Sequence, residues 1–284
     1  MPQRTGGDAH PAARPSGRAC RRAAAALLPL AALTGCAPTA AGDRLDVWAA
    51  SSLAGVLPEL AAEYERAHPG SEVALNFSGS ADLAVQIAEG APADLFVAAD
   101  ERTLQRVLDA GRAAGPALPV ATNRLVIAVA EGNPRGVGSL ADLAGDEVST
   151  VVCAEQVPCG HAARTVQDLA GIDLRPVSEE NAVTDVLGKV RTGQADAGLV
   201  YATDVAAHED ELDAVPLPGA AAAANPYAAV VVPGGEEAAA AAFAELLTGP
   251  AGRERLAAAG FGPPPAATTP AGTDPDPHDP GGSA

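Results

Sequence analysis

Small polar residues follow strand-like segments at four places in the chain, and a helix-like segment begins directly after each of them. Two of these junctions contain serines, Ser51-Ser52 and Ser78-Gly79-Ser80, and the other two read VPCG (157–160) and NAV (181–183). The first turn of a helix presents backbone N–H groups without a partner inside the helix, together with a partial positive charge. The four junctions therefore predict a site for a small anion, which can be bound there without a charged side chain.

Each of these residues also has a simpler explanation when it is considered alone. A single serine in front of a helix is most often an N-cap. Tyr201, at the end of a later strand-like segment, is explained equally well as a half-buried core aromatic whose hydroxyl meets water. The prediction of a ligand site therefore depends on the combination of the four junctions with Tyr201.

The segments around the junctions alternate between strand and helix patterns. Strands are expected at 45–50, 72–77, 94–98, 124–130, 150–153, 197–201 and 225–232. Helices are expected from Leu53 to Tyr64, between Ser80 and Gly90, and at 101–110, 139–143, 160–170, 183–190, 236–247 and 252–259. Such alternation is typical of parallel sheets covered by helices, in which ligands bind at the carboxyl ends of the strands.

The pattern restarts after the strand at 124–130, and two α/β halves joined by two extended strands indicate an α/β protein of two lobes. Each lobe should hold a mostly parallel sheet flanked by helices, with the ligand in the cleft between them. We assign residues 44–122 and 226–262 to the first lobe and residues 123–225 to the second. The proline-rich segment 263–284 has too little apolar surface to fold and is expected to be disordered, with His278 solvated.

The first 35 residues have the composition of an export signal. Five arginines accompany a short apolar run (23–33) that cannot span a bilayer. The sequence LTGC (33–36) resembles the lipobox of bacterial lipoproteins, in which the cysteine is lipid-modified and becomes the N-terminus. We therefore expect lipidation of Cys36 and a tether at 36–43; the alternative is an ordinary cleaved signal. Arg21-Arg22 leaves both the general and the twin-arginine export routes open.

The composition is strongly acidic, which excludes some partners. The 284 residues carry a formal net charge of −18. Such a surface repels nucleic acid and anionic lipid head groups. A buried anion site remains compatible with this charge, because surface charges are screened beyond about 8 Å at physiological ionic strength.

Two cysteines remain outside the leader and the lipobox, Cys153 and Cys159. In an oxidising compartment we expect a disulfide between them. Their spacing differs from the C-x-x-C of redox proteins, and no second Cys/His pair completes a zinc site.

Five segments resemble the molybdate-binding proteins of molybdate ABC transporters, a branch of the type II periplasmic binding proteins. They are LDVWAASSL (45–53), FSGSADLAVQIAEGAPADLFVAAD (77–100), EQVPCG (155–160), NAVTDVL (181–187) and LVY (199–201). GAPADLF is a hallmark of that family. The similarity spans about residues 45–262, although the alanine-rich C-terminal helices match only loosely.

The resemblance implies a periplasmic-binding-protein-like fold that captures molybdate or tungstate. Carried over by motif, the ligand contacts fall on the hydroxyl and N–H groups of Ser52 and Ser80, the backbone N–H groups of Cys159 and Val183, and the hydroxyl of Tyr201. Cys159 stands where a small residue such as alanine is common, and Ser51 is a second candidate beside Ser52.

The resemblance also implies the partners. These are the permease and ATPase subunits of a molybdate ABC importer. We expect a monomer without a cofactor, held at the outer face of the cell membrane through Cys36.

Sulfate, phosphate and Fe(III) are alternative ligands for this fold. A phosphate site usually needs an acceptor for the proton of the ligand, and the matched segments hold none. An Fe(III) site would need paired Tyr or His ligands, but Tyr201 is the only tyrosine in a matched segment.

Two other classes of protein are alternatives to a binding protein. A serine-dependent enzyme could use Ser52 as nucleophile and His161 as base, but no G-x-S-x-G motif surrounds Ser52. A structural lipoprotein would not require four helix starts to converge. We therefore expect a binding protein and not an enzyme.

Overall fold

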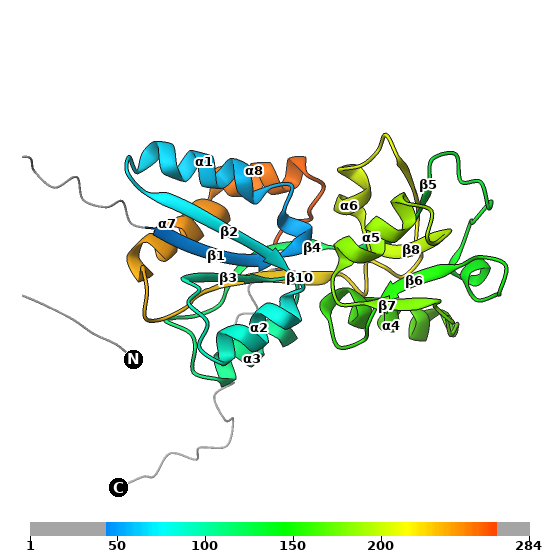
Figure 1. Cartoon of the computed structure of the whole chain (residues 1–284), viewed down its shortest axis with the longest axis horizontal. Helices are drawn as coiled ribbons and strands as arrows, with labels where there is room; N and C mark the ends of the chain where they lie inside the picture. Colours follow the sequence, from blue (N-terminus) through cyan, green and yellow to red (C-terminus); the bar gives the residue numbers. More distant parts are fainter. Residues whose placement is uncertain (1–43, 266–284) are drawn as a thin grey trace, which may run out of the picture. The chain divides into compact units, whose positions relative to one another are not determined.

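Two five-stranded mixed sheets organise residues 44–265, the part of the chain that the computed structural model describes (Figure 1). In the first sheet the strand order is β2-β1-β3-β10-β4. The strands β2, β1 and β3 run parallel to one another, whereas β10 is antiparallel to both β3 and β4. The bounds are β1 (Arg44–Ala50), β2 (Glu72–Ser78), β3 (Leu95–Ala98), β4 (Leu118–Asn123) and β10 (Asn225–Val231).

Helices cover both faces of this sheet, and together they form the first lobe. The helices are α1 (Leu57–Ala67), α2 (Ser80–Ala88), α3 (Glu101–Asp109), α7 (Glu237–Thr248) and α8 (Pro250–Ala258). One apolar core joins the sheet to Tyr64 of α1, Phe243 of α7 and Leu256 of α8. A second core packs Leu83 of α2 and Leu104 of α3 against the other face.

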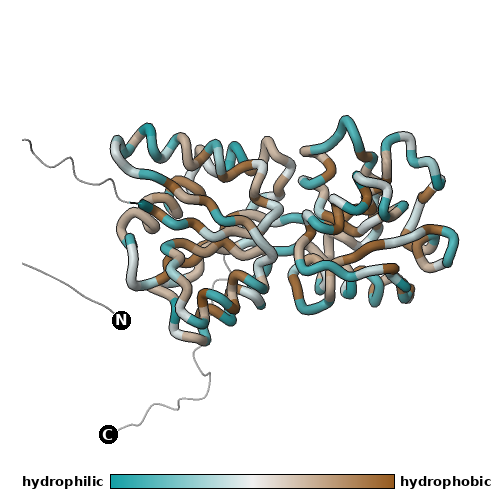
Figure 2. Tube along the Cα trace, in the orientation of Figure 1, coloured by the Kyte–Doolittle hydropathy of each residue, from teal (hydrophilic) through white to brown (hydrophobic). Residues whose placement is uncertain are grey.

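The second lobe is built on a sheet of order β7-β6-β8-β5-β9. Its strands are β5 (Leu125–Ala130), β6 (Thr150–Cys153), β7 (Ser178–Glu180), β8 (Ala197–Tyr201) and β9 (Leu212–Val215), and its helices are α4 (Pro158–Ala170), α5 (Val183–Arg191) and α6 (Ala202–Ala206). Figure 1 shows α5 and α6 on one side of these strands and α4 on the other. In both lobes the hydrophobic residues follow the strands, and hydrophilic residues lie on the outer turns (Figure 2).

The parallel strands of each sheet end level with one another. In the first sheet Ala50 pairs with Ser78 and Ala49 with Val97. In the second sheet Cys153 pairs with Glu180. Because successive residues advance by about 3.3 Å along a strand, level ends place the turns after β1, β2 and β3 in one row and those after β6 and β7 in another.

The chain passes between the two sheets twice. Asn123 ends β4 and is followed by Arg124 and then by β5, and the chain returns to the first sheet at Asn225. Asn123 and Asn225 are register partners in β4 and β10. The two crossings therefore lie side by side and tie the lobes together at one place.

Most expected elements are present within a few residues of their predicted ends. The helix expected from Leu53 begins at Leu57 instead, because Ser51–Leu53 forms a short 3-10 helix (η1) and Pro58 suits the first turn of α1. The elements β4, β7, β9 and α6 have no counterpart among the expected ones. The sheets are mixed rather than mostly parallel because β10 and β5 run against their neighbours.

Some sequence predictions fall outside the described residues. They concern the leader, Cys36, the tether and His278. Within residues 44–265, no helix has the length and the apolar character needed to cross a bilayer.

Candidate ligand-binding site

All five predicted ligand contacts line one small cavity: Ser52, Ser80, Cys159, Val183 and Tyr201. The two serines belong to the first lobe and the other three residues to the second, so the cavity lies between the lobes. None of the residues that line it carries a formal charge. The level ends of the parallel strands explain why residues so distant in the sequence meet here.

The size of the cavity limits what can bind. Its volume is about 20 Å³. A single water molecule needs roughly 10–15 Å³, whereas sites for organic ligands measure about 300–1,000 Å³. The cavity therefore suits a compact inorganic ion better than a sugar, an amino acid or a peptide.

Three helices begin at the cavity without a side-chain cap. Their N-caps are Gly79 for α2, Val157 for α4 and Ala182 for α5, and none of these forms a side-chain hydrogen bond to the first turn. In α3, by contrast, the carboxylate of Asp100 accepts a hydrogen bond from Thr103 N at 2.7 Å. The uncapped first turns leave N–H groups free to bind an anion.

Both serine hydroxyls have a polar partner inside the protein. Ser80 Oγ accepts a hydrogen bond from Ala99 N at 3.1 Å, which leaves the Ser80 proton for another acceptor. Ser52 Oγ lies 2.7 Å from the hydroxyl oxygen of Tyr227. A hydroxyl that already accepts one hydrogen bond is well placed to donate its own proton to a ligand.

Tyr201 ends β8 and is only 1% exposed. Within residues 44–265 its hydroxyl has no partner in hydrogen-bond geometry, although its ring lies edge-on to that of Tyr227, with centroids 6.0 Å apart. Burial raises the pKa of Tyr201 well above its ordinary value, and the nearby Tyr227, Asp204 and Asp100 raise it further. The phenol therefore keeps its proton and offers an unused donor to the cavity.

The turn before α4 is held by a disulfide. Cys153, the last residue of β6, is bonded to Cys159 in the first turn of α4, and the two Cα atoms are 5.6 Å apart. The next residue, Gly160, packs so tightly that a Cβ there would lie 1.9 Å from the carbonyl oxygen of Ala154. The backbone N–H of Cys159 is thus part of a closely constrained turn.

The lobes come into close contact beside the cavity. A Cβ on Gly79 would lie 2.2 Å from the carbonyl oxygen of Asn181 in the other lobe. Gly79 has φ −58° and ψ 128°, which any residue can adopt. Glycine is therefore required at this position by the approach of the second lobe and not by the local backbone conformation.

Residues behind the cavity escaped the sequence predictions. Asp204 is buried, and its carboxylate accepts a hydrogen bond from Tyr201 N at 3.0 Å; burial raises the pKa of Asp204 to about 7. Arg102 donates to the carbonyl oxygens of Glu155 and Gln156, both at 3.3 Å, and so joins α3 to the turn before α4. No motif or periodicity marks these residues, since their roles depend on contacts between lobes or on burial.

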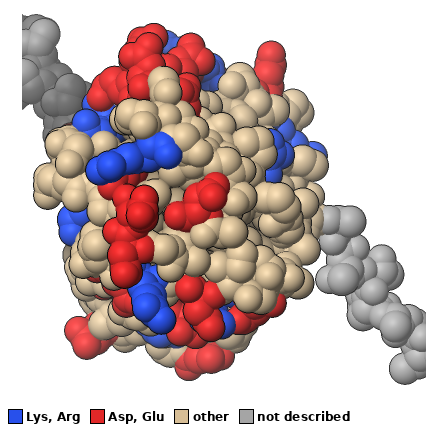
Figure 3. Space-filling view, turned by 90° about the vertical axis from the view of Figure 1, so that its right-hand side faces the viewer, with Lys and Arg blue, Asp and Glu red and all other residues tan. Residues whose placement is uncertain are grey.

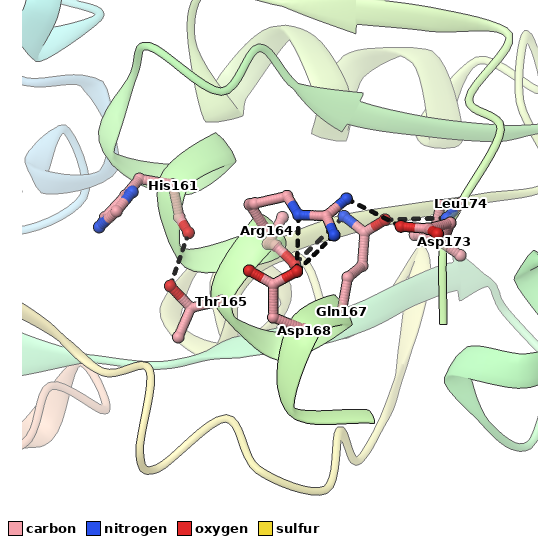
Figure 4. Close-up of polar contacts among 8 residues, drawn as sticks. His161, Arg164, Thr165, Gln167, Asp168, Asp173 and Leu174 are labelled. Carbon is pink, nitrogen blue, oxygen red and sulfur yellow. Dashed lines mark hydrogen bonds and ion pairs between the residues drawn. The ribbon is translucent and has the colours of Figure 1, made fainter. Parts of the chain in front are cut away.

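His161 lies apart from the predicted site. Its side chain is exposed on α4, and Figure 4 shows it away from the ion pairs that Arg164 forms with Asp168 and Asp173. The hydrogen bond of Ser52 is to Tyr227 and not to His161. Within the described residues, no group of three or more His, Cys, Asp or Glu side chains is arranged to hold a metal ion.

Known proteins resemble this chain over most of its length. A family model described as bacterial extracellular solute-binding protein matches residues 45–262. The molybdate-binding protein ModA of Mycobacterium tuberculosis is 42% identical over 228 residues, which cover 80% of this chain and 87% of that protein. The putative ABC transporter substrate-binding lipoprotein YvgL of Bacillus subtilis is 31% identical over 56% of this chain and 63% of its own length.

Solved structures share the two-lobed fold, which confirms the predicted architecture. The periplasmic molybdate-binding protein of Azotobacter vinelandii superimposes with a TM-score of 0.67 at 24% identity, covering 78% of this chain and 99% of its own. The sulfate-binding protein SubI of Mycobacterium tuberculosis also gives 0.67, at 19% identity, covering 78% and 87%. Since the family model spans 45–262 of the 284 residues, this chain belongs to the bacterial extracellular solute-binding proteins.

Proposed function

We propose that this protein binds molybdate or tungstate between its lobes and delivers it to an ABC importer. The observation that carries the proposal is an uncharged cavity of about 20 Å³ that is lined by all five predicted contact residues. The donors that we propose are the hydroxyl and N–H groups of Ser52 and Ser80, the N–H groups of Cys159 and Val183, and the hydroxyl of Tyr201. The 42% identity to a molybdate-binding protein supports molybdate among the anions of this shape.

The donor set explains why phosphate should be rejected. A fully deprotonated dianion has only acceptor oxygens, so every donor of the site can be used. Phosphate near neutral pH keeps a proton, and that proton would face another donor. Leaving a buried polar group unpaired costs about 1–3 kcal/mol.

Sulfate is a second candidate, because the sulfate-binding protein SubI shares the fold with a TM-score of 0.67. Sulfate carries no proton near neutral pH, so the site must discriminate against it by the smaller size of the ion. S–O bonds are shorter than Mo–O or W–O bonds, and oxygens held closer to the centre cannot reach all the donors at once. Packed lobes cannot shrink the cavity freely without strain.

The test is a thermal-shift series on the purified mature protein with molybdate, tungstate, sulfate, phosphate and ferric citrate at equal concentrations. A ligand at 100 times its dissociation constant adds about 2.7 kcal/mol to the free energy of unfolding. We expect large shifts with molybdate and tungstate, a smaller one with sulfate and almost none with phosphate. A shift with sulfate or phosphate as large as that with molybdate would contradict the proposal.

We also infer that the mature protein is a lipoprotein whose lipid on Cys36 holds it at the membrane beside the permease and ATPase subunits. The LTGC sequence at 33–36 supports this inference, as does the name of the relative YvgL. Replacement of Cys36 by alanine should move the protein from the membrane fraction to the soluble fraction. Unchanged membrane association would contradict lipidation.

The disulfide between Cys153 and Cys159 should form in the exported protein and fix the turn that carries the Cys159 N–H group. Its closed loop is short, so its stabilisation should fall below the roughly 3 kcal/mol expected of a 15-residue loop. Peptide mass spectrometry without reduction should find the two residues linked. Two free thiols would contradict this inference.

A further inference from the structure

Tyr227 lies behind the cavity wall and not in it. It belongs to β10, it is fully buried, and its hydroxyl oxygen lies 2.7 Å from Ser52 Oγ. Its ring is held edge-on between those of Tyr201 and Phe261, with centroids 6.0 and 5.5 Å away. The phenol is therefore fixed in place and points its hydroxyl at the serine that lines the cavity.

The side chain of Asn123, at the first crossing between the lobes, is held by two hydrogen bonds. Its carbonyl oxygen accepts a hydrogen bond from Arg124 N at 2.9 Å, and its amide nitrogen donates to Thr203 Oγ1 at 2.8 Å. Burial raises the pKa of Tyr227, as does the nearby Asp204, and polar contacts with Ser52, Asn123 and Tyr201 counteract only part of this effect. The Tyr227 hydroxyl is thus protonated, and Ser52 Oγ lies within hydrogen-bond distance of it, at 2.7 Å.

The direction of the hydrogen bond between Tyr227 and Ser52 decides whether Ser52 presents a donor or an acceptor to a ligand in the cavity. If Ser52 donated to Tyr227, the serine would turn lone pairs toward an anion. If Tyr227 donates to Ser52, the serine proton is free for the ligand. An oxyanion without a proton offers only acceptor oxygens, so its binding favours the second arrangement, in which the phenol proton lies along the 2.7 Å contact to Ser52.

We propose that Tyr227 is a positioning residue that donates to Ser52 and thereby fixes the Ser52 hydroxyl as a donor toward the bound anion. The proposal rests on the proposed binding of an oxyanion in this cavity. A chain of hydrogen bonds in a region of low dielectric strengthens each of its members. Tyr227 thus contributes to affinity and to the rejection of protonated anions without touching the ligand.

The decisive test is a double-mutant cycle read by calorimetry with molybdate. Tyr227→Phe keeps the ring and removes the hydroxyl, so it should weaken molybdate binding by about three- to tenfold, as expected for one hydrogen bond. In a Ser52→Ala background the same change should have no further effect. Tyr64→Phe, in another buried tyrosine of the first lobe, is the matched control and should leave affinity unchanged.

The relative affinity for different anions distinguishes a positioning role of Tyr227 from a general loosening of the fold. A loosened site would lose affinity for all anions alike. In Tyr227→Phe the Ser52 hydroxyl is free to accept as well as donate, so the ratio of molybdate to hydrogen phosphate affinity should shrink. Additive effects in the cycle, or an unchanged ratio, would overturn the proposal.

A measurement without ligand distinguishes this proposal from the proposed function. The hydroxyl proton of Tyr227 should give a slowly exchanging NMR signal in the ligand-free protein, and Ser52→Ala should shift it. If the wild-type protein binds no oxyanion but this signal behaves as expected, the proposed function fails while the hydrogen bond stands. If molybdate binds and Ser52→Ala leaves the signal unchanged, the role of Tyr227 is refuted.

Discussion

Tyr201 has a buried hydroxyl that lacks a partner within the described residues, and this gives its removal two effects of opposite sign. Tyr201→Phe should weaken molybdate binding by about ten- to hundredfold, since a hydrogen bond to a charged group contributes about 1.5–3 kcal/mol. The ligand-free protein should become no less stable, because a buried hydroxyl without a partner is itself unfavourable. Calorimetry and melting curves measure the two effects separately. Unchanged affinity would remove Tyr201 from the site.

Asp204 should make stability depend on pH near neutrality. Burial raises its pKa from 3.8 to about 7 in the folded protein. The folded state then binds this proton more tightly than the unfolded state, so its contribution to stability is complete below about pH 4 and is lost as the pH rises through about 7. The carboxylates with lowered pKa, such as Glu180 and Asp196, act in the opposite sense and at lower pH.

Asp204→Asn tests this dependence. Asparagine retains an oxygen that can accept the hydrogen bond from Tyr201 N, but it does not titrate. Each unit of pKa shift corresponds to about 1.4 kcal/mol. In the wild-type protein the free energy of unfolding should therefore fall by up to a few kcal/mol between pH 4.5 and 8, and denaturant titrations should show that the variant lacks this fall. Asp185→Asn, in an exposed position on α5, is the control. An unaltered pH profile in Asp204→Asn would refute the assignment.

At the scale of elements, the contact between Gly79 and Asn181 should control how closely α2 and α5 approach. In Gly79→Ala the new Cβ would overlap the Asn181 carbonyl oxygen in this arrangement, at 2.2 Å, yet φ and ψ at this position suit alanine. We expect molybdate binding to weaken by at least about tenfold, or 1.4 kcal/mol, with little change in the melting temperature without ligand.

Gly55→Ala is the matched control for this variant, because a Cβ at Gly55 meets nothing within 4 Å. It should bind molybdate like the wild-type protein. Equal affinity in the two variants would show that the Gly79 contact is not part of the bound state. X-ray scattering should show a more open ligand-bound form only for Gly79→Ala.

The elements that carry the cavity were the most predictable part of the fold. The start of α2 at Ser80 and the strands β6 and β8 follow directly from local apolar patterns and turn residues. The elements that were missed are short or half exposed, such as β7, which reads SEE. Three residues without apolar periodicity become a strand only because β6 lies beside them, and no local pattern contains that information.

The same limit applies to the site. The residues that line the cavity lie next to recognisable turns, so the resemblance to a known family located them. The contact between Ser52 and Tyr227 joins residues 175 positions apart, and the burial of Asp204 depends on the packing around α6. Such partners are determined by tertiary structure, which local sequence patterns do not specify.

At the scale of the whole molecule, the formal charge of −18 should have little influence on ligand affinity. The face shown in Figure 3 carries acidic and basic side chains with uncharged surface between them, whereas the cavity is lined by uncharged residues. Surface charges are screened by salt much more strongly than buried dipoles. We expect the dissociation constant for molybdate to change by less than about threefold between low and physiological salt. A change of orders of magnitude would show that surface charge matters more than the cavity.

The place of β10 has a consequence for the order in which the protein folds. Among residues 44–265, β10 is the last strand, yet it lies between β3 and β4, and β4 has no other neighbour in its sheet. The second sheet, in contrast, is complete at Val215. Contacts between distant segments form late because the intervening chain must first be ordered. In pulse-labelling hydrogen exchange during refolding, we expect β5, β6 and β8 to become protected before β4. A partly folded chain would therefore hold a finished second sheet, a first sheet without β10, and no Tyr227 behind Ser52.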